Sequence, residues 1–230
     1  MNEGPVQLNN QRGEKGDELV RHLRSAIRSG RYVPGQRLVE VDLTEEFGVS
    51  RSLLRQAFHR LSAEGLVETV PNRGAIVRRL SFKEVIELFE IRLELEALAA
   101  RLAAQNLVDA ELRRSFEQEV SAIWNEEARL STSAYLIENE KFHAAVFKAS
   151  CNGQLAVLNR QMQLSLIMAQ IASSITPEVM NLSISEHRTI ASAILDRDTD
   201  AADSAARAHL NRARSFVEII PGNLFRKAVP

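Results

Sequence analysis

Apolar side chains recur every third or fourth residue along most of the chain, a spacing that predicts amphipathic helices. The first such stripe, Leu19, Leu23 and Ile27, stops at a glycine. Two shorter stripes follow, one ending at Phe47 and one starting at Arg51, and only Gly-Val-Ser separates them. A glycine at the end of one helix and a serine at the start of the next are typical of two helices joined by a tight turn. The pattern predicts a helix-turn-helix.

After residue 65 the period changes from that of a helix to that of short strands. Two apolar runs, 66–70 and 75–77, flank the turn-forming sequence Pro-Asn-Arg-Gly, which predicts a β-hairpin with a four-residue loop. Helix, helix-turn-helix and hairpin together predict a winged helix over residues 15–80. Residues 1–14 are polar with glycine and proline, so we expect a disordered lead-in there.

From residue 81 to residue 217 the helical period continues without a convincing strand. Ser81 and Glu84 have the spacing of a capping box, and helices are expected at roughly 82–105, 109–128, 133–150, 154–173, 178–196 and 200–217. Residues 218–230 look like a loose tail. The predicted fold class is mainly α, with an N-terminal winged helix-turn-helix and its small β-hairpin followed by an all-α helical bundle.

Charge and cysteine content narrow the kind of protein. Residues 1–80 hold 13 Lys and Arg against 10 Asp and Glu, whereas residues 81–230 hold 16 against 20, so a polyanion is expected to meet the first part. The single cysteine, Cys151, excludes an intramolecular disulfide and a CxxC metal site. No apolar run has membrane-spanning length. We therefore expect a cytoplasmic protein without a membrane partner.

Two arginines mark a candidate DNA-reading face. Arg51 and Arg55 lie one turn apart on the second helix of the helix-turn-helix, away from its core stripe. A guanidinium there can donate two hydrogen bonds to O6 and N7 of guanine in the major groove. Taken singly, each arginine could be an ordinary solvated charge. Their place beside a predicted wing favours DNA.

Neighbouring residues can add contacts to the DNA backbone and the minor groove. Ser50 and Ser52 place hydroxyls where they could reach phosphate oxygens. Arg73 and Gly74 occupy the expected wing tip, where arginine suits a narrow minor groove and glycine permits close approach. His59, one turn beyond Arg55, is expected to contact the DNA backbone or to be merely exposed.

The sequence FGVSRSLLRQAFHRL at 47–61, with EGLV at 64–67 and RGAIV at 73–77, resembles the GntR family of bacterial transcription regulators. Core, turn and reading positions all fall in register with the family pattern. The resemblance implies that Arg51 and Arg55 enter the major groove and Gly74 the minor groove. One position departs from it: many members have an arginine where this chain has Val41. That departure leaves the operator sequence open.

Three histidines in the second part suggest a metal site. His143, His187 and His209 each lie on the inward face of a different predicted helix, and Asn139 lies one turn before His143. Buried imidazoles without partners are costly, and a divalent metal would satisfy all three, with the Asn139 oxygen as a further ligand. The alternative is that each histidine binds a backbone carbonyl.

Residues 81–217 resemble the all-helical FCD domain, the effector domain of the FadR-type branch of GntR proteins. The matching segments are FEIRLELEALA at 89–99, NEKFH at 139–143, EH at 186–187 and AH at 208–209. The resemblance implies that Asn139 and the three histidines bind a divalent metal, zinc above all, with nickel or manganese as alternatives. It also implies a cavity for a small carboxylate. Asn139 stands where many members have aspartate.

The favoured interpretation is a metal-dependent, ligand-responsive transcription regulator that acts as a homodimer on a palindromic operator. We expect it to act as a repressor. Arg92 is a candidate anchor for an organic-acid effector because its planar fork matches a carboxylate, and an interhelical salt bridge is the alternative role. The alternative function is a helical, His-rich metalloenzyme of hydrolase type with an incidental winged helix. No HExxH motif, nucleophile elbow or phosphate loop supports it, so we expect no enzyme.

Overall fold

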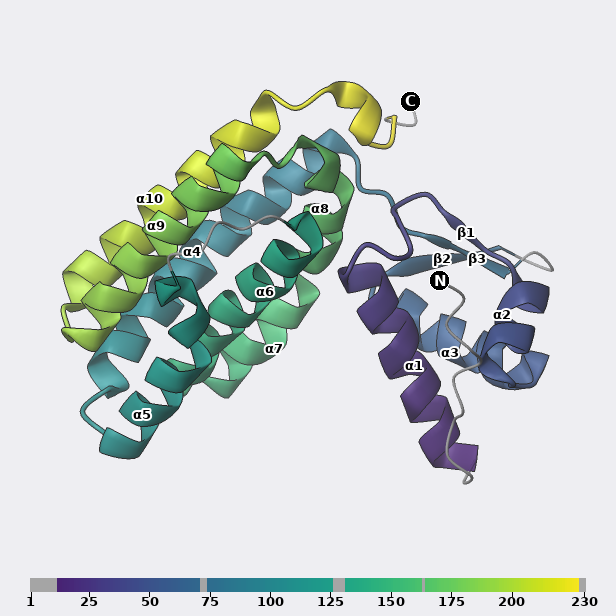
Figure 1. Cartoon of the computed structure of the whole chain (residues 1–230), viewed down its shortest axis with the longest axis horizontal. Helices are drawn as coiled ribbons and strands as arrows, with labels where there is room; N and C mark the ends of the chain where they lie inside the picture. The colour runs from purple at the N-terminus through teal and green to yellow at the C-terminus, as the bar shows by residue number, and fades with distance from the viewer. Residues whose placement is uncertain (1–11, 71–73, 126–130, 163, 228–230) are drawn as a thin grey trace. The chain divides into compact units, whose positions relative to one another are not determined.

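The computed structural model describes residues 12–70, 74–125, 131–162 and 164–227. The chain forms two compact units, Met1–Arg79 and Leu80–Pro230, which Figure 1 colours in sequence order from purple to yellow. The first unit combines helices with a small antiparallel sheet, and the described part of the second is helical. This confirms the predicted fold class.

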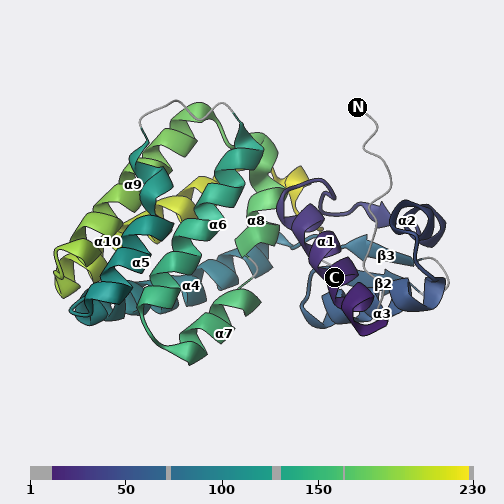
Figure 2. The same ribbon diagram turned by 60° about the horizontal axis from the view of Figure 1, so that its bottom comes forward.

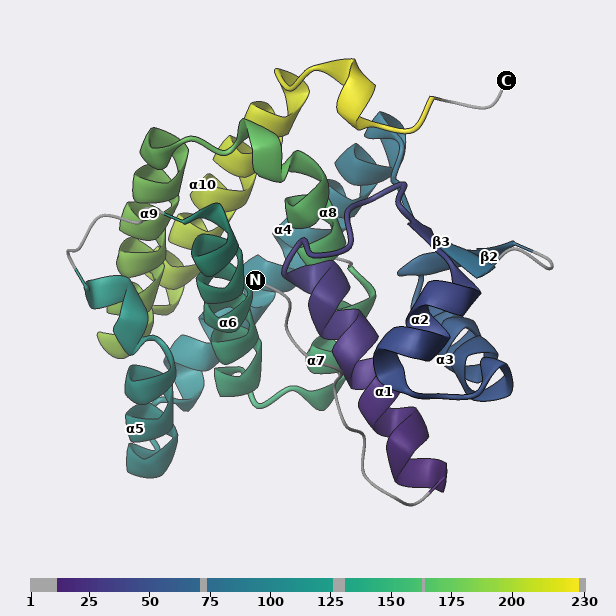
Figure 3. The same ribbon diagram turned by 45° about the vertical axis from the view of Figure 1, so that its right-hand side comes forward.

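The first unit combines three helices with a three-stranded sheet (Figure 3). The helices are α1 (Arg12–Arg28), α2 (Glu40–Phe47) and α3 (Arg51–Ala63), and the strands are β1 (Arg37–Leu38), β2 (Val67–Val70) and β3 (Gly74–Val77). The predicted hairpin is present as β2 and β3, and its loop at 71–73 lies outside the described residues. Strand β1 pairs with the other edge of β3, and no sequence pattern indicated it.

The helix-turn-helix forms through the predicted caps. Gly48 adopts a left-handed conformation with φ of 59° and donates its N–H to the Glu45 carbonyl, which ends α2. Ser50 then caps α3, because its hydroxyl oxygen accepts the N–H of Leu53 at 3.2 Å. The apolar side of α3 is buried through Leu54 and Leu61, so the opposite side of α3 is free to face a partner.

The second unit is a helical bundle in which α4, α9 and α10 lie side by side and α6 packs on α4 (Figures 1 and 2). Its helices are α4 (Phe82–Asn106), α5 (Ala110–Glu119), α6 (Thr132–Ala149), α7 (Gly153–Gln161), α8 (Leu164–Ile171), α9 (Pro177–Leu195) and α10 (Thr199–Glu218). Helix α4 begins with the predicted capping box of Ser81 and Glu84. Buried alanines on α4, such as Ala100 and Ala103, allow the neighbouring helices to approach closely. Among the described residues, no helix is long and apolar enough to cross a membrane.

Two predicted helices are interrupted. The stretch expected at 109–128 ends as α-helix at Glu119, and a 3₁₀ turn, Ser121–Trp124, follows it. The N–H of Val120 still donates to the Phe116 carbonyl at 3.0 Å, but the N–H of Ile123 donates to the Val120 carbonyl at 3.1 Å, which is the tighter spacing of a 3₁₀ turn at a helix end. The stretch expected at 154–173 is divided into α7, α8 and a 3₁₀ turn, Ala172–Ser174.

Both ends of the described chain are more ordered than the sequence predicts. Residues 12–14, expected in the lead-in, form the first turn of α1, and residues 1–11 lie outside the described residues. The loose tail expected from residue 218 is wrong up to residue 227. Phe225 is buried against Phe82, with ring centroids 5.4 Å apart, and the N–H of Arg226 donates to the Leu80 carbonyl at 3.0 Å. The buried ring and the backbone hydrogen bond together hold this segment beside the start of α4.

A side chain from α8 holds the segment that precedes α4. The Gln170 amide accepts the N–H of Leu80 at 2.8 Å and donates to the Leu80 carbonyl at 2.9 Å. Gln170 and Leu80 are both buried. The pair of bonds satisfies the Leu80 backbone as a strand partner would.

Candidate DNA-reading surface and metal centre

The structure places the two predicted reading arginines on the exposed side of α3. Arg51 is its first residue and Arg55 follows one turn later. Arg55 does not project freely, because its Nε and Nη2 donate to the two carboxylate oxygens of Glu40 at 2.8 and 3.0 Å. Glu40 is the first residue of α2, so a side chain that the sequence analysis missed joins the two helices of the motif.

The two predicted serines differ in what their hydroxyls already do. The Ser50 oxygen is used as the cap of α3, while Ser52 is exposed in the first turn of that helix. His59 is also exposed. Val41, at the position where family members carry arginine, has 46% of its surface exposed at the start of α2. An apolar side chain therefore occupies that part of the surface.

The wing residues are placed in part. Arg73 lies outside the described residues. Gly74 is the first residue of β3 and is buried, with φ of 90°. A Cβ built there would lie 2.3 Å from the carbonyl oxygen of Leu38 in β1. The sheet itself therefore requires glycine at this position, and the proposed minor-groove role of Gly74 stays a prediction.

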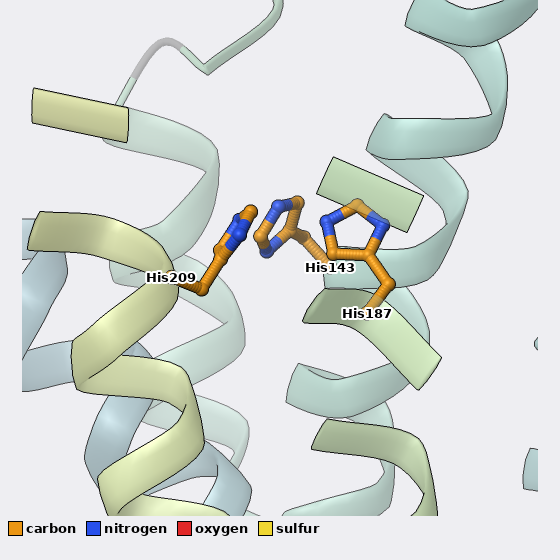
Figure 4. Close-up of side chains that lie close together, drawn as sticks. All are labelled: His143, His187 and His209. Carbon is orange, nitrogen blue, oxygen red and sulfur yellow. The ribbon is translucent and has the colours of Figure 1, made fainter. Parts of the chain in front are cut away.

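The three predicted metal-binding histidines meet in the core of the second unit (Figure 4). His143 comes from α6, His187 from α9 and His209 from α10, and all are buried. One ring nitrogen from each lies within 4.8 Å of the other two. Asn139 is buried one turn before His143 and lines the same cavity. The helical spacing seen in the sequence thus brings the three histidines together, and Asn139 lies with His143 and His209 at the cavity wall.

Two of the histidines are held by glutamates that the sequence analysis missed. His143 Nδ1 lies 2.6 Å from Glu96 on α4, and His209 Nδ1 lies 2.7 Å from Glu186 on α9. Each carboxylate fixes its imidazole with Nδ1–H as donor, which leaves Nε2 available as a metal ligand. Glu186 directly precedes His187 in the sequence, but no sequence signal pointed to its bond with His209.

Each of these glutamates is in turn held by an arginine. Arg92 donates from Nε and Nη2 to one oxygen of Glu96, at 2.9 and 2.6 Å, and Arg212 donates from the same atoms to both oxygens of Glu186, each at 2.7 Å. Burial raises the pKa of Glu96, but Arg92 and His143 outweigh it and hold that pKa well below its usual range. The two sets, Arg92–Glu96–His143 and Arg212–Glu186–His209, are called the relays below. In each relay the arginine holds the glutamate and the glutamate holds the histidine.

His187 has no such partner among the described residues. It is fully buried, neither ring nitrogen has a hydrogen bond, and its ring stacks on Phe142 at a centroid distance of 4.0 Å. Burial lowers the pKa of His187 well below its usual value, so the ring is neutral. A neutral buried imidazole with an orphaned nitrogen, facing two others whose Nε2 is available, fits a divalent metal.

The cavity beside the histidines is small. Arg92, Asn139, Leu164, Met168 and Arg212 are among the residues that line it, and its open space is about 40 Å³. That is room for about three water molecules. Arg92 thus lines a cavity, as the sequence predicts. It also forms a salt bridge, the alternative role predicted for it, but its partner Glu96 lies on the same helix, so the bridge is not interhelical.

The fold and the site define a class of protein. Bacterial transcription regulators combine a winged helix-turn-helix that carries exposed arginines with a second, helical unit. The comparisons give the family. Residues 15–77 match the bacterial regulatory proteins of the gntR family, and residues 87–212 match the FCD domain. The chain belongs to the GntR family and carries an FCD domain.

Known relatives agree with this assignment. The chain is 32% identical over 194 residues to the Nta operon transcriptional regulator of Aminobacter aminovorans, covering 83% of this chain and 89% of that one. It is 30% identical over 210 residues to the transcriptional repressor RspR of Escherichia coli K12, covering 88% and 89%. The solved structure of E. coli McbR/YncC has a TM-score of 0.72 at 21% identity, covering 88% of this chain and 96% of that one, and supports the fold.

Proposed function

We propose that this protein is a cytoplasmic transcription regulator that binds a palindromic operator as a homodimer and whose affinity for DNA changes when a small carboxylate binds at a metal centre in its helical domain. The observation that carries the proposal is the orphaned, buried His187 between His143 and His209. Relatives named as operon regulators and repressors favour regulation, and repression in particular, over the hydrolytic alternative.

A dimer follows from the size of the reading unit. One winged helix contacts too few base pairs to distinguish its operator from the many competing sites in a genome. A twofold dimer doubles the number of base pairs read and matches a palindrome whose half-sites lie about one helical turn apart. The second unit would then set the separation of the two winged helices.

The residues proposed to hold the metal are His143, His187, His209 and Asn139. The two glutamate-held histidines offer Nε2, His187 offers a ring nitrogen, and Asn139 offers its amide oxygen. Imidazole-rich sites suit zinc, nickel and manganese to different degrees, and zinc is the first choice. When bound, such an ion supplies positive charge that attracts a carboxylate. The positive charges of Arg92 and Arg212 are each balanced by the negative charge of the glutamate that they hold.

Arg92 remains the proposed second anchor of the effector, with a modified role. Glu96 already accepts hydrogen bonds from Nε and Nη2 of Arg92. Arg92 would therefore offer the effector an oriented positive charge at the cavity wall, and not the two donors of that edge. Arg212, which also lines the cavity, is in the same position. The effector proposed for this cavity is a small carboxylate, placed between the metal and these two positive charges.

Two elements connect the cavity with the segment that follows the wing. Helix α8 supplies Leu164 and Met168 to the cavity wall and Gln170 to the backbone of Leu80. Helix α4 carries Arg92 and begins at Phe82, and the four residues 78–81 separate it from the end of β3 at Val77. A ligand acts on DNA only if it favours one arrangement of the two winged helices, and these elements are the proposed route.

The first test concerns the reading arginines. Arg51→Ala and Arg55→Ala are each expected to weaken binding to the selected operator about 5- to 100-fold, because a two-pronged contact to guanine is lost. Titration of each variant against the operator and a scrambled duplex checks this. Equal losses on both duplexes would reduce the arginines to phosphate contacts.

The second test concerns the effector. Acetate, followed by larger carboxylates, is expected to bind the zinc-loaded protein with an affinity that operator DNA alters, by the same factor by which the acid alters operator affinity. Calorimetry with and without operator measures both affinities. Identical affinities in the two titrations contradict the coupling, and chemical turnover of the acid would instead favour the metalloenzyme.

A further inference from the structure

The family resemblance assigns no role to Glu40, a residue of the DNA-binding unit that pairs with Arg55. Its carboxylate lies at the first position of α2 and receives two hydrogen bonds from Arg55, one on each oxygen. The Glu40 side chain is 15% exposed, whereas that of Arg55 is 53% exposed. The glutamate is therefore the fixed member of the pair and the arginine is the member that a partner can reach.

Stability does not account for this pair. Ion pairs with such exposure contribute little to the free energy of unfolding, because solvent screens them and two long side chains must be ordered. What a two-pronged pair does fix is the plane and direction of the guanidinium. Since the pair orders two side chains and adds little stability, its main effect is to fix the orientation of the Arg55 guanidinium.

The geometry leaves one edge of the guanidinium for DNA. Glu40 occupies the edge formed by Nε and Nη2 of Arg55, so the edge between Nη1 and Nη2 carries the remaining donors. Guanine presents O6 and N7 as a pair of acceptors in the major groove, and such a two-donor edge matches it. The Glu40 carboxylate at the same time repels phosphate groups, which opposes the use of Arg55 as a simple backbone contact.

We propose that Glu40 is a specificity-determining residue of the regulator: it positions the guanidinium of Arg55 so that Arg55 reads a base and not a phosphate. This inference rests on the proposed function, since it requires the exposed face of α3 to meet the major groove. Glu40 acts through Arg55 and is a positioning residue.

The chain offers a matched control. Glu64, next to the end of α3, receives two hydrogen bonds from Arg24 of α1, at 2.8 and 2.6 Å. This pair has the same chemistry and the same fork geometry as Arg55 with Glu40, at the opposite end of α3 from Ser50. Glu40→Gln and Glu64→Gln remove the same charge from the same domain, and only the first touches a reading arginine.

The experiment uses the full-length protein. Binding sites are first selected from a randomised duplex pool with the wild type, and the affinities of wild type, Glu40→Gln, Glu64→Gln and Arg55→Ala are then measured on the selected site and on all its single base-pair variants. We expect Glu40→Gln to lose discrimination about tenfold at one base pair per half-site, the same pair at which Arg55→Ala loses it. Its affinity for scrambled DNA should be unchanged or higher, and Glu64→Gln should keep the wild-type profile.

Each other outcome has a defined meaning. An unchanged base preference in Glu40→Gln overturns the inference, and so does an unchanged preference in Arg55→Ala. Loss at a base pair different from that of Arg55→Ala shows that Glu40 reads a base itself and likewise overturns the positioning role. If the wild type selects no sequence at all, the proposed function fails first. Equal loss in Glu64→Gln shows a general charge effect and contradicts a specific role of Glu40.

Discussion

His187→Leu is expected to abolish stoichiometric zinc binding while leaving the metal-free protein at least as stable as the wild type. In the metal-free state His187 buries two ring nitrogens without hydrogen bonds, and each such group costs about 1–3 kcal/mol. Leucine removes that cost and keeps a similar volume against Phe142. The metal-bound wild type gains what the variant cannot, since a ligand at about a thousand times its dissociation constant stabilises by about 4 kcal/mol.

The measurements are elemental analysis of the purified proteins and thermal unfolding with and without added zinc. His59→Ala serves as the control, because His59 is exposed on α3 and far in sequence from the three clustered histidines. Wild type and His59→Ala should hold about one zinc per chain and unfold at a higher temperature with zinc. Full metal content in His187→Leu would show that His187 is an ordinary core residue and would contradict the proposed set of ligands.

The parts of the fold that depend on local sequence could be predicted, and those that depend on distant partners could not. Gly48 and Ser50 act within one turn of chain, so the helix-turn-helix was readable from its caps. Strand β1 has only two residues and exists through its pairing with β3. Phe225 is ordered through its contact with Phe82. Neither partnership leaves a periodic signal in the sequence.

The same distinction explains the site. The helical period was sufficient to place His143, His187 and His209 on inward faces, and the bundle brings those faces together. The bonds from Glu96 to His143 and from Glu186 to His209 join different helices, so only the tertiary structure shows them. The pair of Arg92 with Glu96, in contrast, has the spacing of neighbours on one helix and was open to prediction.

Gly74→Ala is expected to destabilise the first unit by at least about 2 kcal/mol, from two separable causes. The first is the positive φ of 90°, which is unfavourable for any residue with a Cβ. The second is the contact of 2.3 Å that the Cβ would make with the Leu38 carbonyl oxygen. That oxygen belongs to the backbone, so it can move only if β1 shifts away from β3, where Leu38 pairs with Ala75.

Gly30→Ala separates the two causes. Gly30 also has a positive φ, of 77°, but a Cβ there would meet nothing within 4 Å, so Gly30→Ala should cost only the backbone strain, about 1 kcal/mol. Denaturant unfolding of both variants measures the difference, and operator titration shows whether a shifted β1 also disturbs Glu40, whose backbone nitrogen lies 3.5 Å from the same Cβ position. Equal destabilisation of the two variants would mean that the sheet accommodates the methyl group and that glycine at residue 74 serves DNA contact alone. A larger loss in Gly74→Ala assigns the glycine first to the sheet that supports the wing.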